Sequence, residues 1–503
     1  MRRSLWLAAS GVAVLLSTGL VRGVVQDVGR GDADLQFQVG TLLFEETRYR
    51  EALEAFEAAA QSSDPALAVR ARKGKIRTAL RLAEFGLART DAAQLRATVP
   101  DDPEAVALEG DALWSAGLFD EAEAAYGDAI GLGGGASRAR LGMARSLATE
   151  GRLPEALSEA QAALAAAPRD GDIHATIGEI LERQQQYAEA ADAYTNYINL
   201  LPNRDRSEKA GWARAQVRFL RSFDGVQPVA IDMEDQQTLH TVPFRIVNDK
   251  VVVQARVNGG RPQDFVLDTG SEETVISAGT ARRLGIRPVT YTLSAGVGEV
   301  GLRGLQLARV DQLEIGSLSV RNLPVLIKNP ALGGIPRRER ESISPLSLGM
   351  SMTIDYEQRL LTIGRDLPVG EPDVRLPMRV NRLALVRGLL NATQPAYFVV
   401  DTGGEVISIS ADTAGQLAPV EGRKIALRVY GSSGWDRDAF LMPGVNLDFD
   451  QIKYRNFSMV VLNLRAPSAL LGFQLGGIVG HRFLSNYRVS MDMARAELRL
   501  NEF

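Results

Sequence analysis

The chain has 503 residues, too many for one compact core, and its length suggests about three domains. Its formal net charge is -4 and 23% of its residues are charged, so the composition points to neither a nucleic-acid partner nor a disordered tail. Cysteine is absent, which excludes disulfides, thiolate metal sites and a cysteine nucleophile. The three histidines, His174, His240 and His481, are scattered, so we expect no metal site, no Ser-His-Asp hydrolase and no cofactor. Polar chemistry must come mainly from carboxylates.

Residues 1–23 have the layout of a secretory signal peptide. Two arginines precede an apolar run from Leu5 to Leu20, and small residues follow. The run is short for a membrane span, but Arg22 beside the cleavage point leaves an uncleaved signal-anchor open. We expect an exported protein, periplasmic or secreted, with membrane contact only if this segment is retained.

Residues 33–222 read as a helical repeat array. Two of its stretches align so that Gly110 matches Gly178 and Tyr126 matches Tyr194. Small residues recur at a spacing of about 34 residues, namely at Ala52, Gly86, Ala122, Ala156 and Ala190.

This spacing resembles the tetratricopeptide repeat family. The resemblance implies five pairs of antiparallel helices and a capping helix near residues 207–221, with the unit around Gly86 as the weakest match. Stacked helix pairs form a superhelix whose concave face binds an extended protein partner. The alternative is a structural spacer, because no repeat residue by itself marks a ligand.

From about residue 225 the sequence turns to short runs of Val, Ile, Leu and Thr separated by Gly, Asn and Asp, which predicts an all-β region. Residues 223–241 are expected to be a linker. The rest repeats itself internally and is expected to form two related lobes, residues 242–366 and 375–503.

The stretch "DFVLDTGSEETVIS", residues 264–277, taken alone would be an ordinary β-turn between two strands. It recurs as "YFVVDTGGEVISIS", residues 397–410, which places Asp268 on Asp401. The same offset also places Ile276 on Ile409. Two such motifs in register within a duplicated β-unit favour a paired functional site over two unrelated turns.

These motifs resemble the retropepsin-like and pepsin-like aspartic proteases, here as a single-chain pseudo-dimer with one Asp-Thr-Gly loop in each lobe. The resemblance implies an all-β double-lobed fold in which Asp268 and Asp401 form the catalytic dyad. Two carboxyls about 3 Å apart share one proton, so one takes a proton from water while the other gives one to the peptide carbonyl. The residues expected to support the dyad loops are Thr269, Gly270, Ser271, Thr402, Gly403 and Gly404.

A flap over the dyad is predicted at two glycine-bearing hairpin tips, with Gly296 and Gly298 in the first lobe and Tyr430 and Gly431 in the second. Ordinary hairpin turns are the alternative. A closing flap would exclude water and orient the substrate.

The chain departs from the family pattern in two places. Gly404 stands where Ser or Ala usually follows the Asp-Thr-Gly motif. Ser344 and Pro345 stand where the first lobe should have a hydrophobic residue and a glycine, the counterpart of Val479 and Gly480 in the second.

The sequence therefore predicts an exported aspartic endopeptidase that cleaves a protein or peptide substrate, with the repeats recruiting a protein partner. The alternative is a non-catalytic scaffold in which both halves only bind peptides or proteins.

Overall fold

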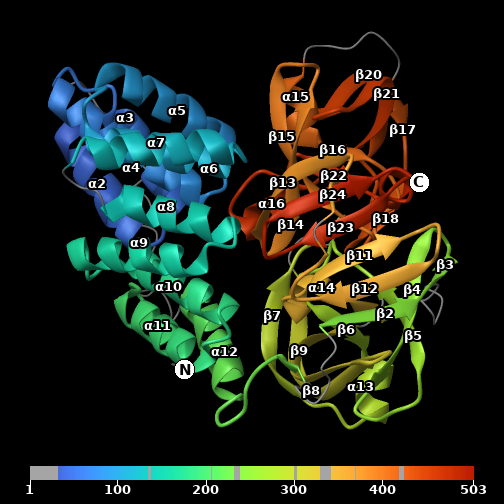
Figure 1. Cartoon of the computed structure of the whole chain (residues 1–503). Helices are drawn as coiled ribbons and strands as arrows, with labels where there is room; N and C mark the ends of the chain where they lie inside the picture. The colour runs from blue at the N-terminus through green and yellow to red at the C-terminus, as the bar shows by residue number, and fades with distance from the viewer. Residues whose placement is uncertain are drawn as a thin grey trace, which may run out of the picture.

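The computed structural model describes residues 32–133, 137–205, 207–231, 238–298, 303–328, 341–368, 370–417 and 424–503. Residues 1–23, the expected signal peptide, lie outside this described part. A helical array stands beside a β domain made of two lobes (Figure 1). This architecture confirms the fold class expected from the sequence.

The array consists of antiparallel helix pairs that follow the repeat spacing, closed by one further helix. Its described helices are α2 (Ala33–Glu45), α3 (Tyr49–Ala59), α4 (Pro65–Arg81), α5 (Phe85–Thr98), α6 (Pro103–Ser115), α7 (Phe119–Gly131), α8 (Ser137–Thr149), α9 (Leu153–Ala166), α10 (Gly171–Arg183), α11 (Tyr187–Leu200) and α12 (Glu208–Arg221).

Glycines let the two helices of a pair approach closely. A Cβ on Gly178 would lie 2.9 Å from the ring of Tyr194, and one on Gly110 would overlap the ring of Tyr126 in the same way. Both tyrosine rings are buried. The expected match of Gly86 with Ala52 needs a correction of two residues: Gly86 is exposed with no atom within 4 Å of its Cβ position, and the fourth residue of α5, equivalent to Ala52 of α3, is the buried Ala88.

The first lobe contains β1 (Ala230–Ile231), β3 (Arg245–Val247), β4 (Lys250–Val257), β5 (Gln263–Leu267), β6 (Thr274–Ser277), α13 (Ala278–Arg283), β7 (Pro288–Ser294), β8 (Arg303–Ile315), β9 (Leu318–Lys328), β10 (Ser342–Ile343) and α14 (Pro345–Leu348). The second contains β14 (Leu383–Leu390), β15 (Gln394–Val400), β16 (Ser408–Ser410), α15 (Ala411–Gln416), β17 (Ile425–Ala426), β18 (Val429–Gly431), β19 (Gly434–Asp436), β20 (Phe440–Phe449), β21 (Ile452–Leu462), α16 (Arg465–Leu471), β22 (Gly477–Val479) and α17 (His481–Leu484).

The two lobes repeat one topology. In the first lobe β4 pairs antiparallel with β5, β5 pairs parallel with β10, and β6 pairs parallel with β9. In the second, β14, β15, β22, β16 and β21 make the same three kinds of pairing. The sequence duplication is therefore a duplication of strand pairing.

A shared sheet joins the lobes. Its strands run in the order β13 (Val374–Asn381), β24 (Glu497–Asn501), β23 (Arg488–Asp492), β11 (Ser351–Asp355), β12 (Leu360–Gly364) and β2 (Leu239–Pro243). At its centre Met352 pairs with Met491, and one hydrophobic core runs through both lobes. This common core fixes the lobes, and with them the two Asp-Thr-Gly loops, relative to each other.

The segment expected to be a linker, residues 223–241, is packed against the β domain where it is described. Phe223 and Val229 are buried, Ala230 pairs with Arg321 of β9, and β2 begins within the segment. The strand β1 is too short to show an alternating pattern, which is why the sequence does not reveal it.

The array is docked on the second lobe through a buried aromatic cluster. Phe119 of α7 packs against Tyr397 and Phe473, with ring centroids 4.7 and 5.0 Å apart. The backbone N–H of Gln474 donates to the carbonyl of Ser115 at 2.8 Å. Burial of such rings against one another is favourable, so array and lobe share one core.

Charged contacts surround this cluster. Arg379 of β13 lies 2.8 Å from Asp120 and 3.1 Å from Glu123, and Arg387 lies 2.9 Å from Asp120. Since Arg379 is buried, its partners are needed to keep the charge from costing stability. At the other end of the array, α12 packs against the first lobe through Phe219.

Candidate active site

Asp268 and Asp401 occupy matching places, each directly after a buried strand of its lobe. The backbone N–H of Asp268 donates to the carbonyl of Ile343 at 2.9 Å, and that of Asp401 donates to Val479 at 3.0 Å. The parallel pairing of β5 with β10 and of β15 with β22 produces these bonds. Both aspartates are half-buried. The backbone hydrogen bonds fix their position, and part of each residue remains accessible to solvent.

The two loops are cross-linked by their threonines. The hydroxyl of Thr269 donates to the carbonyl of Val400 at 2.6 Å, and the hydroxyl of Thr402 donates to Leu267 at 2.6 Å. Each hydroxyl oxygen also accepts the backbone N–H of the other threonine, at 3.0 and 3.2 Å. Both threonines are fully buried. This reciprocal arrangement, expected from the family resemblance, ties the lobes together directly under the aspartates.

The two carboxyls face each other across the glycines of the loops. A Cβ on Gly403 would lie 2.7 Å from Asp268 Oδ1 and 3.2 Å from Asp401 Oδ1, and one on Gly270 would overlap the Asp401 carboxyl. The Gly270 N–H donates to Asp268 Oδ1 at 3.1 Å, and the Gly403 N–H donates to Asp401 Oδ1 at 2.8 Å. Only glycine leaves room for the two carboxyls at these positions.

Burial and mutual repulsion keep a proton on this pair. Burial, and after it the neighbouring Asp268 carboxylate, raise the pKa of Asp401 to about 7. Burial also raises the pKa of Asp268, against the lowering effects of Lys328, the Gly270 N–H, Lys250 and a hydrogen bond with Asp401. Two close carboxyls cannot both ionise easily, so the pair titrates as a unit.

The structure explains why the second loop has glycine at position 404, where the family usually has Ser or Ala. Its N–H donates to Asp401 Oδ1 at 2.9 Å, and a Cβ there would lie only 2.8 Å from Asp401 Oδ2. In the first lobe the equivalent residue, Ser271, directs its hydroxyl proton to the carbonyl of Glu273 at 2.8 Å. Neither position therefore supplies a hydroxyl donor to its aspartate.

The sequence alignment of Ser344 and Pro345 with Val479 and Gly480 was wrong by one residue. Ile343 accepts the N–H of Asp268 as Val479 accepts that of Asp401, so Ser344 is the counterpart of Gly480. Pro345 opens α14, where its missing N–H costs nothing.

Ser344 also supports the first dyad loop. In the second lobe the N–H of His481 donates to the carbonyl of Gly404 at 2.8 Å. Pro345 has no N–H to do this, and the Ser344 hydroxyl instead donates to the carbonyl of Ser271. A side chain thus replaces a backbone donor.

The four flap candidates come together at two hairpin tips. The Ser433 N–H donates to the carbonyl of Val297 at 2.9 Å, which joins the β18–β19 tip to the tip that follows β7. Gly298, with φ of 135°, and Gly296 approach the β18–β19 tip so closely that a Cβ on either would overlap it, and Gly431 approaches Val297 in the same way. Tyr430 packs its ring on Trp435, 5.3 Å away. Residues 299–302, the rest of the first candidate, lie outside the described part.

Exposed apolar side chains accompany these hairpins. Tyr291, Leu293 and Trp435 are 62%, 42% and 41% exposed. Two of them share one face of β7, because side chains two residues apart on a strand point the same way.

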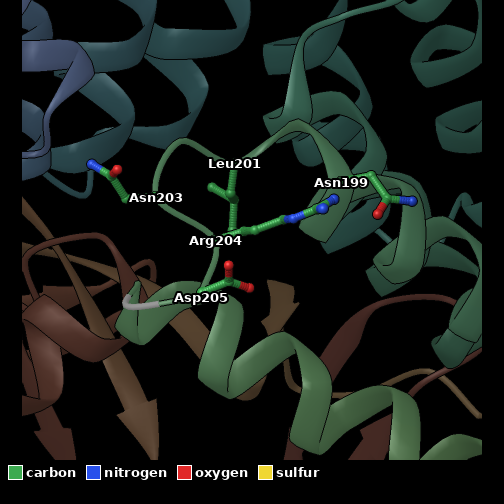
Figure 2. Close-up of a pocket in the computed structure, with 5 residues that line it drawn as sticks. All are labelled: Asn199, Leu201, Asn203, Arg204 and Asp205. Atoms are coloured by element: carbon green, nitrogen blue, oxygen red, sulfur yellow. The ribbon is translucent and has the colours of Figure 1, made fainter.

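A separate pocket of about 420 Å³ lies in the array and holds none of the dyad residues (Figure 2). It is lined by the end of α11 and the turn after it, through Asn199, Leu201, Asn203, Arg204 and Asp205. Within the described ranges, no cluster of three or more His, Asp or Glu residues is arranged to hold a metal ion. The helices of these same ranges include none that is long and apolar enough to span a bilayer.

Sequence reasoning missed an acidic group beside the first dyad loop. Glu272 lies 2.8 Å from Arg382, and burial, followed by the charges of Glu272 and of Glu182 in the array, raises the pKa of Glu273 well above its ordinary value. The only available signal was the pair of glutamates after Ser271, where the second lobe has Glu405 and Val406.

Comparisons with known proteins agree with this division of the chain. An aspartyl protease family model matches residues 253–352, and a tetratricopeptide repeat model matches residues 73–137 and 141–204. The first match includes Asp268 but ends before Asp401. Asp401 is related to Asp268 by the internal duplication of the chain. No curated protein matches the chain at a significant level of sequence similarity.

Solved structures similar to parts of the chain are of the same two kinds. A thermophilic TPR protein of Thermus thermophilus is 19% identical, with a TM-score of 0.32 over 37% of this chain and 98% of that one. YrrB, a TPR protein with an unusual peptide-binding site, is 18% identical, with a TM-score of 0.23 over 41% and 99%. An aspartic proteinase from Irpex lacteus is 11% identical, with a TM-score of 0.33 over 52% and 97%.

Proposed function

We propose that this chain, which joins tetratricopeptide repeats to an aspartyl protease domain, is an exported aspartic endopeptidase. The observation that carries the proposal is the facing pair of carboxyls on two cross-linked loops, with the pKa of Asp401 raised to about 7 by burial and by Asp268. The basic and then apolar N-terminus supports export.

The arrangement suits peptide hydrolysis by an activated water. The ionised carboxyl takes a proton from the water, while the protonated one donates to the carbonyl oxygen of the scissile bond. The threonine cross-link holds the two groups at a fixed separation, so the geometry does not have to be organised during the reaction. Exposed apolar side chains on the hairpins offer a surface for an extended peptide.

The test is cleavage of an unfolded protein or peptide mixture by the full chain and by Asp268→Asn and Asp401→Asn. Each variant should lose about 10²- to 10⁴-fold in kcat/KM, because each removes a general acid or base. Asp450→Asn, an exposed position with φ of 53° that asparagine tolerates, is the matched control.

Activity should also fall as the pH rises past about 7, because Asp401 then gives up the shared proton. If both dyad variants cut as fast as the parent chain, the assignment is wrong. If the parent chain cuts nothing at any pH, the non-catalytic scaffold is the better description.

A further inference from the structure

The repeat array curves with the first helix of each pair on its inner side. The first helices of neighbouring pairs pack on one another, α2 on α4, α4 on α6, α6 on α8 and α8 on α10. The second helices of neighbouring pairs show no comparable packing within the described residues. Because closer packing on one side bends a stack towards that side, the first helices line the inner face of the array.

Two contacts join the beginning of the array to its end. Arg81, the last residue of α4, donates through Nη2 to Asp172 in the first turn of α10, 91 positions away. These helices are the first of the second and fifth pairs, so the ion pair spans the inner face past α6 and α8. Nearer the two ends, the Lys209 ammonium of α12 lies 5.8 Å from the centroid of the Tyr49 ring of α3. The stack therefore closes on itself.

The charges at this closure act on one another. Asp172 raises the pKa of Arg81 above its ordinary value. Although burial acts to raise the pKa of Asp172, the charges of Arg81, Lys209 and Arg138 bring it below its ordinary value. Burial, and after it the charge of Arg81, lower the pKa of Lys209 to about 8. Three side chains from α4, α10 and α12 thus form one electrostatic group.

The closure has no apolar core. Within the described ranges, the buried apolar clusters of the array join α2 with α3, α4 with α5 and α6, or α8 to α12 among themselves, and none joins α3 or α4 with α10 or α12. The side chains of Arg81 and Asp172 are 33% and 44% exposed. Ion pairs with this exposure add little stability and are screened by salt. Parting these helices therefore breaks polar contacts and uncovers no buried apolar cluster.

We propose that Arg81, Asp172, Lys209 and Tyr49 form a latch that holds the array closed on itself and keeps a protein partner from its inner face until the latch opens. Each member of the ion pair also suits its own helix, because a cation is favourable at the C-terminal end of α4 and an anion at the N-terminal end of α10. Both charges thus stay favourable in the open array. The latch is an autoinhibitory contact within the array and does not depend on the proposed peptidase function.

The experiment measures a distance across the closure in the full chain. The sequence has no cysteine, so Glu54→Cys on α3 and Arg218→Cys on α12, both exposed and outside the latch, can carry spin labels without background. At low salt we expect one short distance between the labels. Arg81→Gln, Asp172→Asn and, with the latch residues intact, 1 M salt with its screening length of about 3 Å should each add a population longer by about 10 Å, the diameter of a helix.

A matched control separates the latch from a general effect of lost charge. Glu155→Gln removes an ion pair with Arg152 of similar exposure that lies within α9 alone, and it should leave the distance unchanged. The double variant Arg81→Gln with Asp172→Asn should match either single variant, because all three remove the same interaction. Circular dichroism shows that the helices of each variant are intact.

Access to the inner face is measured with a single cysteine, Glu179→Cys, which lies two turns after Asp172 on the same side of α10 and is exposed. A maleimide carried on a long polymer should react about two- to fivefold faster when Asp172→Asn is also present, a factor that matches the weakness of an exposed ion pair. A small maleimide should react at the same rate in both.

The proposal is overturned if the labels already show the long distance at low salt, or if salt and both latch variants leave only the short one. Equal rates for the polymer maleimide with and without Asp172→Asn would show that the closure does not limit access to the inner face. None of these measurements uses cleavage, so a failure of the latch and a failure of the proposed function remain distinguishable.

Discussion

Gly404 and Ser271 fill equivalent positions after the two aspartates, and they leave the carboxyls in different surroundings. Asp401 Oδ1 accepts two backbone N–H groups, from Gly403 and Gly404, whereas Asp268 Oδ1 accepts the Gly270 N–H. The residue that departs from the family pattern is therefore the one that lets a second N–H reach the carboxyl.

Gly404→Ser should reduce cleavage by about tenfold or more, because its Cβ would lie 2.8 Å from Asp401 Oδ2 and displace the carboxyl. The mirror substitution, Ser271→Gly, adds no atoms and should cost much less. Rates for the two variants, with circular dichroism to show that both fold, check this expectation. Equal losses in the two would contradict the steric argument.

The shared proton also makes stability depend on pH. The pKa of Asp401 is raised from 3.8 to about 7, so the folded chain holds a proton that the unfolded chain releases. Stability should therefore be highest near pH 4 and fall as the pH rises towards 7. Asn at position 401 carries no charge at any pH. Near pH 7 the free energy of unfolding of Asp401→Asn should therefore exceed that of the parent chain by on the order of 1–4 kcal/mol. Urea unfolding at the two pH values measures this, and a constant difference between the proteins would exclude the dyad as its cause.

At the scale of elements, the two lobes hold their Asp-Thr-Gly loops with different hydrogen-bond donors. Each dyad loop is held by the segment that follows β10 or β22. In the second lobe a backbone N–H at the start of α17 does this, and Gly480 is required because a Cβ would lie 2.7 Å from the backbone of Glu405. In the first lobe a proline takes the equivalent place and the Ser344 hydroxyl supplies the bond.

Two substitutions compare these solutions. Ser344→Ala removes one buried hydrogen bond and should lower the free energy of unfolding by about 1–2 kcal/mol. Gly480→Ala forces a Cβ into backbone atoms and should cost about 3 kcal/mol. Denaturant titration gives both values. A negligible effect of Ser344→Ala would show that its hydroxyl does not support the loop.

At the scale of the whole molecule, array and protease domain form one structure. Tyr397, which contacts Phe119 of the array, precedes Asp401 on strand β15. The Tyr397 hydroxyl donates to Asp120 of α7 at 3.0 Å. The strand that leads to the Asp401 carboxyl is thus packed against a repeat helix, so the array is not a flexibly tethered module.

Phe119→Ala should lower the stability of both parts. Loss of a fully buried phenylalanine costs about 3–5 kcal/mol, and amide exchange should speed up in β15 of the second lobe as well as in α7. Phe56→Ala is the matched control, because Phe56 packs in a cluster confined to the first helix pair and its neighbours. Hydrogen exchange that rises in α7 while β15 stays protected would show that the two parts fold independently.

The sequence by itself determined the repeat array, the duplicated β-unit and the pairing of Asp268 with Asp401. These features are periodic or duplicated along the chain, so equivalent residues recur at fixed offsets that one sequence reveals. The threonine cross-link was implied by the resemblance of these motifs to the aspartic proteases.

Only the tertiary structure decided the contacts that have no counterpart elsewhere in the chain. The bond from Ser344 to Ser271 and the docking of Phe119 on Tyr397 join residues far apart in sequence that follow no repeat. Such contacts depend on how two differently built surfaces fit together, and side-chain packing across them leaves no periodic signal. The sequence thus identified the pair of carboxyls, whereas the fold decided what surrounds them.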